Sequence, residues 1–293
     1  MNITATSFST RIRTWLLIAG LTALLIGFGG LIGGGALYLF VGLAIVMNVA
    51  GYWFSDRFAL RASRAQPVEP GSMPWLESDV RDLAARAGVP VPRLYLIPSD
   101  QPNAFATGRN PKHAAVAVTQ GLLHQLPQDQ VKGVLAHEFG HIQNRDILVS
   151  SIAAMVAGAI SAIANILQFS FLFGGEDDDN PLGLIGTLAA IIVAPMAAML
   201  LQLAVSRQRE YLADATGARL LGRAAPLADA LESLERGAQA APMQVNDATA
   251  SLYAVNPLPR AGVAGLFMTH PPTAERISRL RALDGVPAVR MVA

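Results

Sequence analysis

Three long windows without a charged residue dominate the pattern of hydrophobic and polar positions along this chain. They run from Thr14 to Ser55, from Ile147 to Gly175 and from Pro181 to Ser206. About 20 apolar residues cross a bilayer as a helix, so the first window is long enough for two crossings and each of the others for one. The pattern therefore predicts four transmembrane helices, with an acidic loop at 176–180 between the last two.

Outside these windows, the apolar positions follow the periods of a small α+β domain. The proline-rich residues 65–74 are typical of a linker, and helical spacing follows at 76–87. Strand-like segments are found at 92–97, 103–108 and 113–118. We therefore expect a small sheet covered by helices.

The longest helix of this domain is expected to begin at Pro127, a good first-turn residue. The sequence predicts that it continues without a break through Asn144, Arg145 and Asp146 into the window at Ile147. It would then connect the soluble domain directly to a transmembrane helix.

These elements divide the chain into five parts. They are a cytoplasmic lead at 1–13, transmembrane pairs at 14–55 and 147–206, and two parts of one soluble domain at 56–146 and 207–293. The fold class expected is a multi-pass α-helical membrane anchor with an α+β domain.

Composition and charge agree with a membrane protein. Apolar residues make up 52% of the 293 residues and charged residues only 15%, against about a quarter in soluble domains. The net charge of +1 excludes a field that would favour nucleic acid, and the chain has no cysteine for a disulfide or a thiol nucleophile.

Basic residues flank one side of the predicted crossings, at Arg11, Arg13, Arg57, Arg61, Arg64, Arg145, Arg207 and Arg209. The positive-inside rule then places both termini and the soluble domain in the cytoplasm.

The strongest chemical signal is the run His137-Glu138-Phe139-Gly140-His141. Histidines four apart share one face of a helix, and each can give one nitrogen to a tetrahedral zinc ion. Glu138 would flank the metal and suits a general base that activates water. The small residues Gly133, Ala136 and Gly140 are expected to leave room for a substrate strand. The alternative is a polar helix end with two solvated histidines.

A catalytic zinc ion needs a third protein ligand. Glu210 is the best candidate, and it shares a helix face with Asp214, four residues on. Asp214 could then accept the free N–H of a zinc-bound histidine and fix its tautomer. The alternative for this segment is a solvated helix with charges at i and i+4.

Two further segments offer candidates with open alternatives. His270 or Arg276 could donate to the oxyanion of the tetrahedral intermediate; alternatively, His270 is a structural hydrogen-bonding group and Arg276 pairs with an acid such as Asp214. A substrate backbone could add as a strand to an edge formed by Asn103, Ala104, Phe105 and Ala106, or this segment is part of an ordinary hairpin.

The chain resembles the HtpX-type membrane zinc peptidases, which are related to the CAAX prenyl proteases. The matching segments are Asn103-Ala-Phe-Ala-Thr-Gly, His137-Glu-Phe-Gly-His141 with Asp146, Arg209-Glu-Tyr-x-Ala-Asp214 and Thr269-His-Pro-Pro-Thr-x-x-Arg276-Ile. The resemblance implies a gluzincin-type protease domain with one Zn²⁺ per chain on His137, His141 and Glu210. It also implies Glu138 as the catalytic acid and base, with Asp214 behind the ligands.

The same resemblance implies a biological setting. The protein would lie in the bacterial inner membrane and cleave unfolded or membrane polypeptides on the cytoplasmic side. It would help to remove misfolded or damaged membrane proteins, often under stress, alongside membrane quality-control partners.

Two other functions remain open from the sequence. A CAAX-type processing protease would usually have more crossings and a large intramembrane chamber. A non-catalytic zinc-binding membrane scaffold would be expected to lose Glu138, which is present here. An ion or solute transporter would need ionisable groups within the crossings, and the windows contain none.

Overall fold

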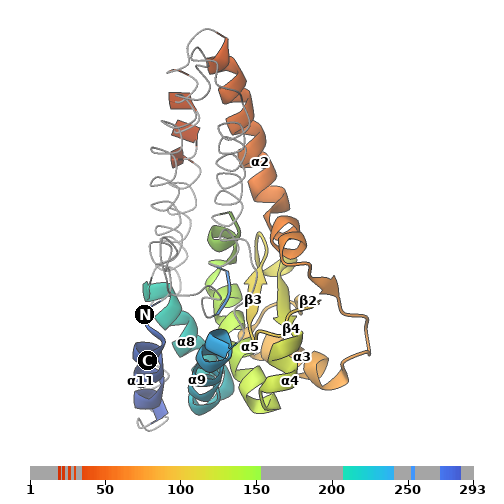
Figure 1. Ribbon diagram of the computed structural model, residues 1–293, viewed down its shortest axis with the longest axis vertical. Coiled ribbons are helices and arrows are strands. Elements are labelled where there is room, and N and C mark those ends of the chain that lie inside the picture. Colours follow the sequence, from red (N-terminus) through yellow and green to blue (C-terminus); the bar gives the residue numbers. More distant parts are fainter. Residues whose placement is uncertain are drawn as a thin grey trace.

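The computed structural model describes residues 35–152, 207–240, 252–254 and 271–284, with a few positions between 19 and 30. Several sequence predictions lie outside these residues. They are the extent of the first crossing, the helix pair after residue 152, the acidic loop at 176–180, and His270. Figure 1 shows one long helix, α2, standing on a compact domain of helices and strands.

Helix α2 spans Ala36–Ala62, so it extends beyond the end of the window at Ser55. Its last turns therefore pack on the domain, where Ala59 and Leu60 are buried. Among the described residues, no single helix has the length and apolar composition to cross a bilayer. The bent pair Leu37–Val46 and Asn48–Ala62, which meet at 44°, does meet both criteria together.

A four-stranded sheet forms the centre of the domain. Its strands are β1 (Gln66–Pro67), β2 (Arg93–Ile97), β4 (Ala115–Thr119) and β3 (Ala104–Thr107), in that spatial order. Strands β2 and β4 are parallel, and the two outer pairings are antiparallel. The three predicted strands are therefore present, and the predicted linker contributes the short edge strand β1. Strand β3 forms the opposite edge.

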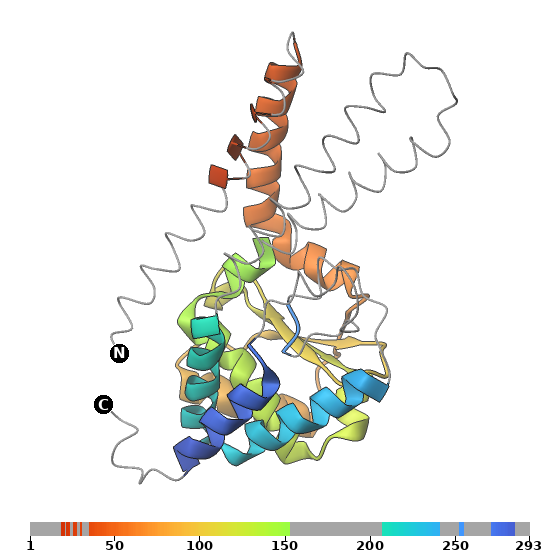
Figure 2. The ribbon, with the colours of Figure 1, turned by 60° about the vertical axis from the view of Figure 1, so that its left-hand side comes forward.

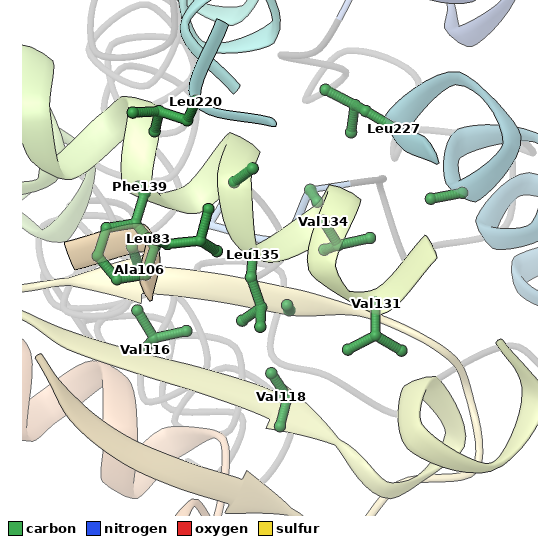
Figure 3. Packing of buried hydrophobic residues seen from close by; sticks show 14 of the residues in the cluster. Leu83, Ala106, Val116, Val118, Val131, Val134, Leu135, Phe139, Leu220 and Leu227 are labelled. Atoms are coloured by element: carbon green, nitrogen blue, oxygen red, sulfur yellow. The ribbon is translucent and has the colours of Figure 1, made fainter. Parts of the chain in front are cut away.

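The alternating residues of β3 and β4 separate two hydrophobic layers. Val116 and Val118 point toward Leu135 of α5 (Gln128–Asn144), as Figure 3 shows. Helix α3 (Pro74–Ala87) covers the same face, and Gly88 ends it in the left-handed conformation. On the other face, Phe105 packs with the end of α2 and with Tyr253. The sheet is thus buried on both sides, and α5 is held firmly against it.

Further helices surround this centre in the part of the chain that the structure describes. The short helix α4 (Gln120–Gln125) follows β4 and is capped by Thr119, whose hydroxyl oxygen accepts the N–H of Leu122. Helices α8 (Arg207–Leu221), α9 (Ala225–Ala240) and α11 (Thr273–Asp284) pack on one another, and α8 and α9 also pack on α5 (Figure 2).

The small residues of α5 have a different role from the one expected. A Cβ atom at Gly140 would lie 2.8 Å from the carbonyl oxygen of Ala213, and one at Gly217 would lie 3.0 Å from the backbone of Ala136. At Gly133 it would lie 2.8 Å from the backbone of α9. These residues therefore bring helices into close contact and do not make room for a substrate strand, because neighbouring backbone already fills the space.

This packing predicts the effect of Gly140→Ala. Glycine to alanine in a helix normally stabilises by about 1 kcal/mol, but here the added methyl group meets fixed backbone. We expect the free energy of unfolding to fall by about 1–3 kcal/mol, as in overpacked cores. Thermal unfolding in detergent measures the change. Gly42→Ala in α2, where a Cβ has no neighbour within 4 Å among the described residues, is the matched control, and equal stability of the two variants would contradict the packing argument.

The predicted continuous helix across residues 144–147 is wrong. Helix α5 ends at Asn144, and Arg145 adopts a left-handed conformation with φ of 60°. The N–H of Asp146 returns to the carbonyl of His141 at 3.2 Å, and a new helix covers 147–152. The left-handed residue closes α5 in the way that glycine usually does, and the chain changes direction at Asp146.

Candidate metal centre

Helices α5 and α8 bring three candidate ligands together. The Nε2 atoms of His137 and His141 are 3.1 Å apart. Each lies 3.6 Å from a carboxylate oxygen of Glu210. One ligand atom from each of the three residues lies within 4.8 Å of the others. The close contact at Gly140 places these two helices near enough for the three side chains to converge.

The donor set fits zinc. Two donors at zinc–nitrogen bond lengths in a tetrahedral site lie about 3.3 Å apart, close to the three separations found here. Two imidazoles and one carboxylate also form the ligand set of a catalytic zinc ion, which leaves a fourth position open. The geometry therefore suits a zinc ion held by His137, His141 and Glu210.

A buried ion pair holds the ring of His137. Its Nδ1 atom lies 2.9 Å from Oδ1 of Asp214. Arg276, which is 1% exposed, donates to both oxygens of this carboxylate at 2.9 and 2.7 Å. Burial raises the pKa of Asp214, but the guanidinium of Arg276 outweighs this and lowers it to about 2. A charged Asp214 accepts the Nδ1–H of His137 and leaves Nε2 free to bind a metal.

The ring of His141 is held in the same way by Asp146. Its Nδ1 atom lies 3.1 Å from each carboxylate oxygen, and Asp146 is 1% exposed. In the sequence, Asp146 follows the histidine motif, but its residue type and position alone predict no role for it. The signal in the sequence that could have identified this role is a carboxylate five residues after His141. This carboxylate reaches the ring only because the helix ends before Arg145.

The charges around the site favour a cation. Burial and the nearby charge of Arg276 lower the pKa of His137, so its ring is neutral, as a ligand must be. Burial also opposes a charge on His141, yet the carboxylates of Asp146 and Glu210 raise its pKa to about 10. Buried charges need compensation, and a metal ion would supply it in place of the proton on His141.

Glu138 lies in the same buried region, 2% exposed. Burial raises the pKa of its carboxyl group to about 8. The backbone N–H of Ala106 in β3 donates to it. Its Oε1 atom is buried and has no hydrogen-bond partner among the described residues. A buried carboxylate oxygen left without a partner is costly, which is characteristic of a functional group.

Strand β3 places the predicted edge beside Glu138. Ala104, Phe105 and Ala106 belong to this edge strand, and Asn103 precedes it and accepts the N–H of Thr119. The edge is partly covered, because the N–H of Ala254 donates to the carbonyl of Ala104 at 3.0 Å. The carbonyl of Ala254 in turn accepts from Arg276 at 2.8 Å. One short segment thus joins the sheet edge to the residue that holds Asp214.

The role of Arg276 follows from these contacts. Of the two sequence hypotheses, the structure favours pairing with Asp214 over donation to an oxyanion, since Nε and Nη2 bond to Asp214 and Nη1 to Ala254. Ala254 was missed by the sequence analysis. Its role is made by backbone atoms, which leave no signal in residue type.

The bonds to the outer ring nitrogens predict the effect of Asp146→Ala. Removing such a partner typically lowers metal affinity by about 10–100-fold, because the ring loses its orientation and its tautomer. Competition with a chelator measures the affinity for zinc. Asp129→Ala removes an exposed carboxylate that pairs with Arg223 on the surface and should leave the affinity unchanged. Equal affinities of the two variants would show that Asp146 does not support the ligand.

Comparison with known proteins shows which protein family this chain is similar to. Residues 70–284 match the model of peptidase family M48. A protease HtpX homolog of Pelotomaculum thermopropionicum is 52% identical over 277 residues, which cover 93% of this chain and 98% of the relative. The protease HtpX homolog of Pyrococcus abyssi is 48% identical over 275 residues, covering 93% and 95%.

A solved structure has a related fold. The crystal structure of S. mikatae Ste24p matches with a TM-score of 0.51 and 21% identity, over 94% of this chain and 67% of that one. At this identity the likeness concerns the fold alone. The family and the two relatives are peptidases by name, and the donor set described above is one that a zinc ion can use. This chain belongs to peptidase family M48 and is a zinc-dependent membrane metalloprotease.

Proposed function

We propose that the protein is an endopeptidase of the bacterial inner membrane, in which His137, His141 and Glu210 hold the zinc ion and Glu138 is the general base. The observation that carries the proposal is the convergence of the three ligands beside the buried carboxylate of Glu138. A scaffold without catalytic activity would not need that carboxylate.

The residues of the chain divide the chemistry between them. When bound, zinc polarises the scissile carbonyl and lowers the pKa of water towards neutrality. Glu138 accepts the proton of the attacking water at its carboxylate and passes it to the leaving amine. The N–H of Ala106 orients that carboxylate. Asp146 and Asp214 keep the two imidazoles in the tautomer that directs Nε2 inward.

Strand β3 supports a mode of substrate binding. An extended polypeptide would add to its outer edge, where Ala104 and Ala106 direct their backbone groups away from β4. This follows from the contacts of Ala104 with Ala254 and of Ala106 with Glu138. Backbone pairing does not depend on side-chain identity, which suits a protease for unfolded chains.

The membrane setting completes the proposal. The chain is a membrane protein, anchored by transmembrane pairs at 14–55 and 147–206, and the domain parts at 56–146 and 207–293 face the cytoplasm together with the lead at 1–13. The exposed apolar side chains along α2 and the basic residues at its lower end support this orientation. The substrates are then misfolded or damaged membrane proteins, and membrane quality-control proteins are its partners.

A cleavage assay with two substrates tests this function against the alternative that the sequence left open, the processing of prenylated C-termini. We expect the protein in detergent to cleave an unfolded membrane polypeptide at internal bonds. A strong zinc chelator should abolish the cleavage, and added zinc should restore it. A prenylated peptide should be cut no faster than its unmodified form. Faster cleavage that depends on the prenyl group would support the other function.

A further inference from the structure

The side chains of helix α2 change in type from its beginning to its end. Its upper residues are apolar and exposed, with Tyr38 80%, Leu39 70% and Val46 63% accessible. Next come half-exposed aromatic rings, among them Trp53 at 50%. This order, apolar and then aromatic, is typical of a helix that leaves a bilayer at the level of the lipid headgroups.

Basic side chains follow the aromatic rings on the same helix face. Arg57 and Arg61 come four and eight residues after Trp53, and both are exposed. The guanidinium of Arg57 lies 5.3 Å from the centre of the Phe54 ring. The nearest acid in the sequence, Asp56, is taken by Arg93 at 2.8 Å.

A second basic group reaches this place from the catalytic domain. Arg109, in the loop between β3 and β4, has its guanidinium 4.7 Å from the centre of the Trp53 ring. Within the described residues, neither Arg57 nor Arg109 forms an ion pair with a carboxylate. Arginines elsewhere on the domain surface, such as Arg223 and Arg281, do so.

The β3–β4 loop fixes the position of Arg109. Gly108 has φ of +139°, and a Cβ there would lie 2.5 Å from the carbonyl oxygen of His113. The N–H of His113 donates to the carbonyl of Asn110 at 2.9 Å. The preceding residue, Thr107, is bonded to Ser151 at 2.7 Å. A loop closed in this way presents its arginine in one direction.

We propose that Trp53, Arg57 and Arg109 form a binding site for the headgroup of an anionic phospholipid. Two guanidinium groups, each over an aromatic ring and without a carboxylate partner among the described residues, provide donors for a lipid phosphate. The apolar face of α2 continues the site toward the acyl chains. The inference rests on the proposed membrane anchor. It adds that the bilayer surface contacts the catalytic domain itself, through a loop three residues from the N–H that orients Glu138.

Site-specific fluorescence quenching tests this site in the full-length protein. Trp15 and Trp75 are replaced by phenylalanine, so that Trp53 is the single tryptophan. The protein is reconstituted in phosphatidylcholine vesicles that contain either brominated phosphatidylglycerol or brominated phosphatidylcholine. At about 1 kcal/mol for each basic side chain near the surface, we expect at least about fivefold stronger association with the brominated phosphatidylglycerol. High salt should reduce this preference.

Two double variants separate a site from a general effect of charge. Arg57→Ala/Arg109→Ala should remove the preference for phosphatidylglycerol, whereas Arg223→Ala/Arg236→Ala, which removes the same charge from exposed positions between α8 and α9 and on α9, should keep it. A preference that survives in the first variant overturns the site. The site would also be overturned if an acidic peptide displaced the lipid and bound to the protein more tightly than the lipid does.

The outcomes also distinguish this site from the function on which it rests. Equal quenching by both brominated lipids overturns the headgroup site and leaves the anchor intact. Absence of quenching by either lipid overturns the membrane position of α2 as well. Zinc-dependent cleavage of an unfolded polypeptide, measured on the same samples, reports on the peptidase independently of both results.

Discussion

Glu138→Gln is expected to abolish peptide cleavage and to leave zinc bound. Glutamine has nearly the same shape, so the ligands His137 and His141 on the same helix should keep their positions. The amide cannot accept the proton of the attacking water, and loss of a general base typically costs about 10²–10⁴-fold in rate. The measurements are cleavage of an unfolded polypeptide in detergent and the zinc content of the same preparation.

Glu69→Gln is the matched control, because it makes the same change at an exposed position of the segment before α3. It should retain full activity. If Glu138→Gln cleaved at the wild-type rate, with contaminating proteases excluded, Glu138 would not be the base. Loss of zinc together with activity would instead assign it a role in metal binding.

Glu210→Ala is expected to lose zinc. The remaining ligands, His137 and His141, would hold the ion with two bonds, and the buried carboxylates around them would lack a compensating charge. Since loss of an outer partner alone costs about 10–100-fold in metal affinity, we expect loss of a ligand to exceed about 100-fold. Metal analysis of the purified protein, followed by competition with a chelator, measures the change.

The control for this variant is Glu232→Ala in α9, which removes a partly exposed carboxylate beside Arg281. It should purify with one zinc ion per chain. Full zinc content in Glu210→Ala would mean that another residue supplies the third ligand.

The zinc ligands could be predicted from the sequence, because residues at fixed spacings along a regular helix lie on the same face. Residues 137 and 141 share a face by periodicity alone, and the pair Glu210 and Asp214 does so on α8. Strand β2 could be predicted in a similar way, because the run Arg93-Leu-Tyr-Leu alternates as in a strand. What was read correctly from the sequence is local.

The parts that were missed depend on contacts between elements. In the sequence, Gly140 is compatible both with an open cleft and with a tight contact between helices. The position of the Ala213 backbone in the structure shows that it makes a tight contact. Arg145 is not a residue type that marks a helix end, so the turn that delivers Asp146 to His141 was not predicted. Ala254 acts through its backbone, which every residue possesses.

The support of His137 has a consequence for the newly synthesised protein. Arg276 lies 139 positions after His137, in α11, the last helix that the structure describes. A chain still attached to the ribosome can have exposed all three ligands while Asp214 still lacks its guanidinium. Such a chain would hold its metal less tightly than the folded protein, so full zinc affinity requires that α11 has been synthesised and has packed on α8.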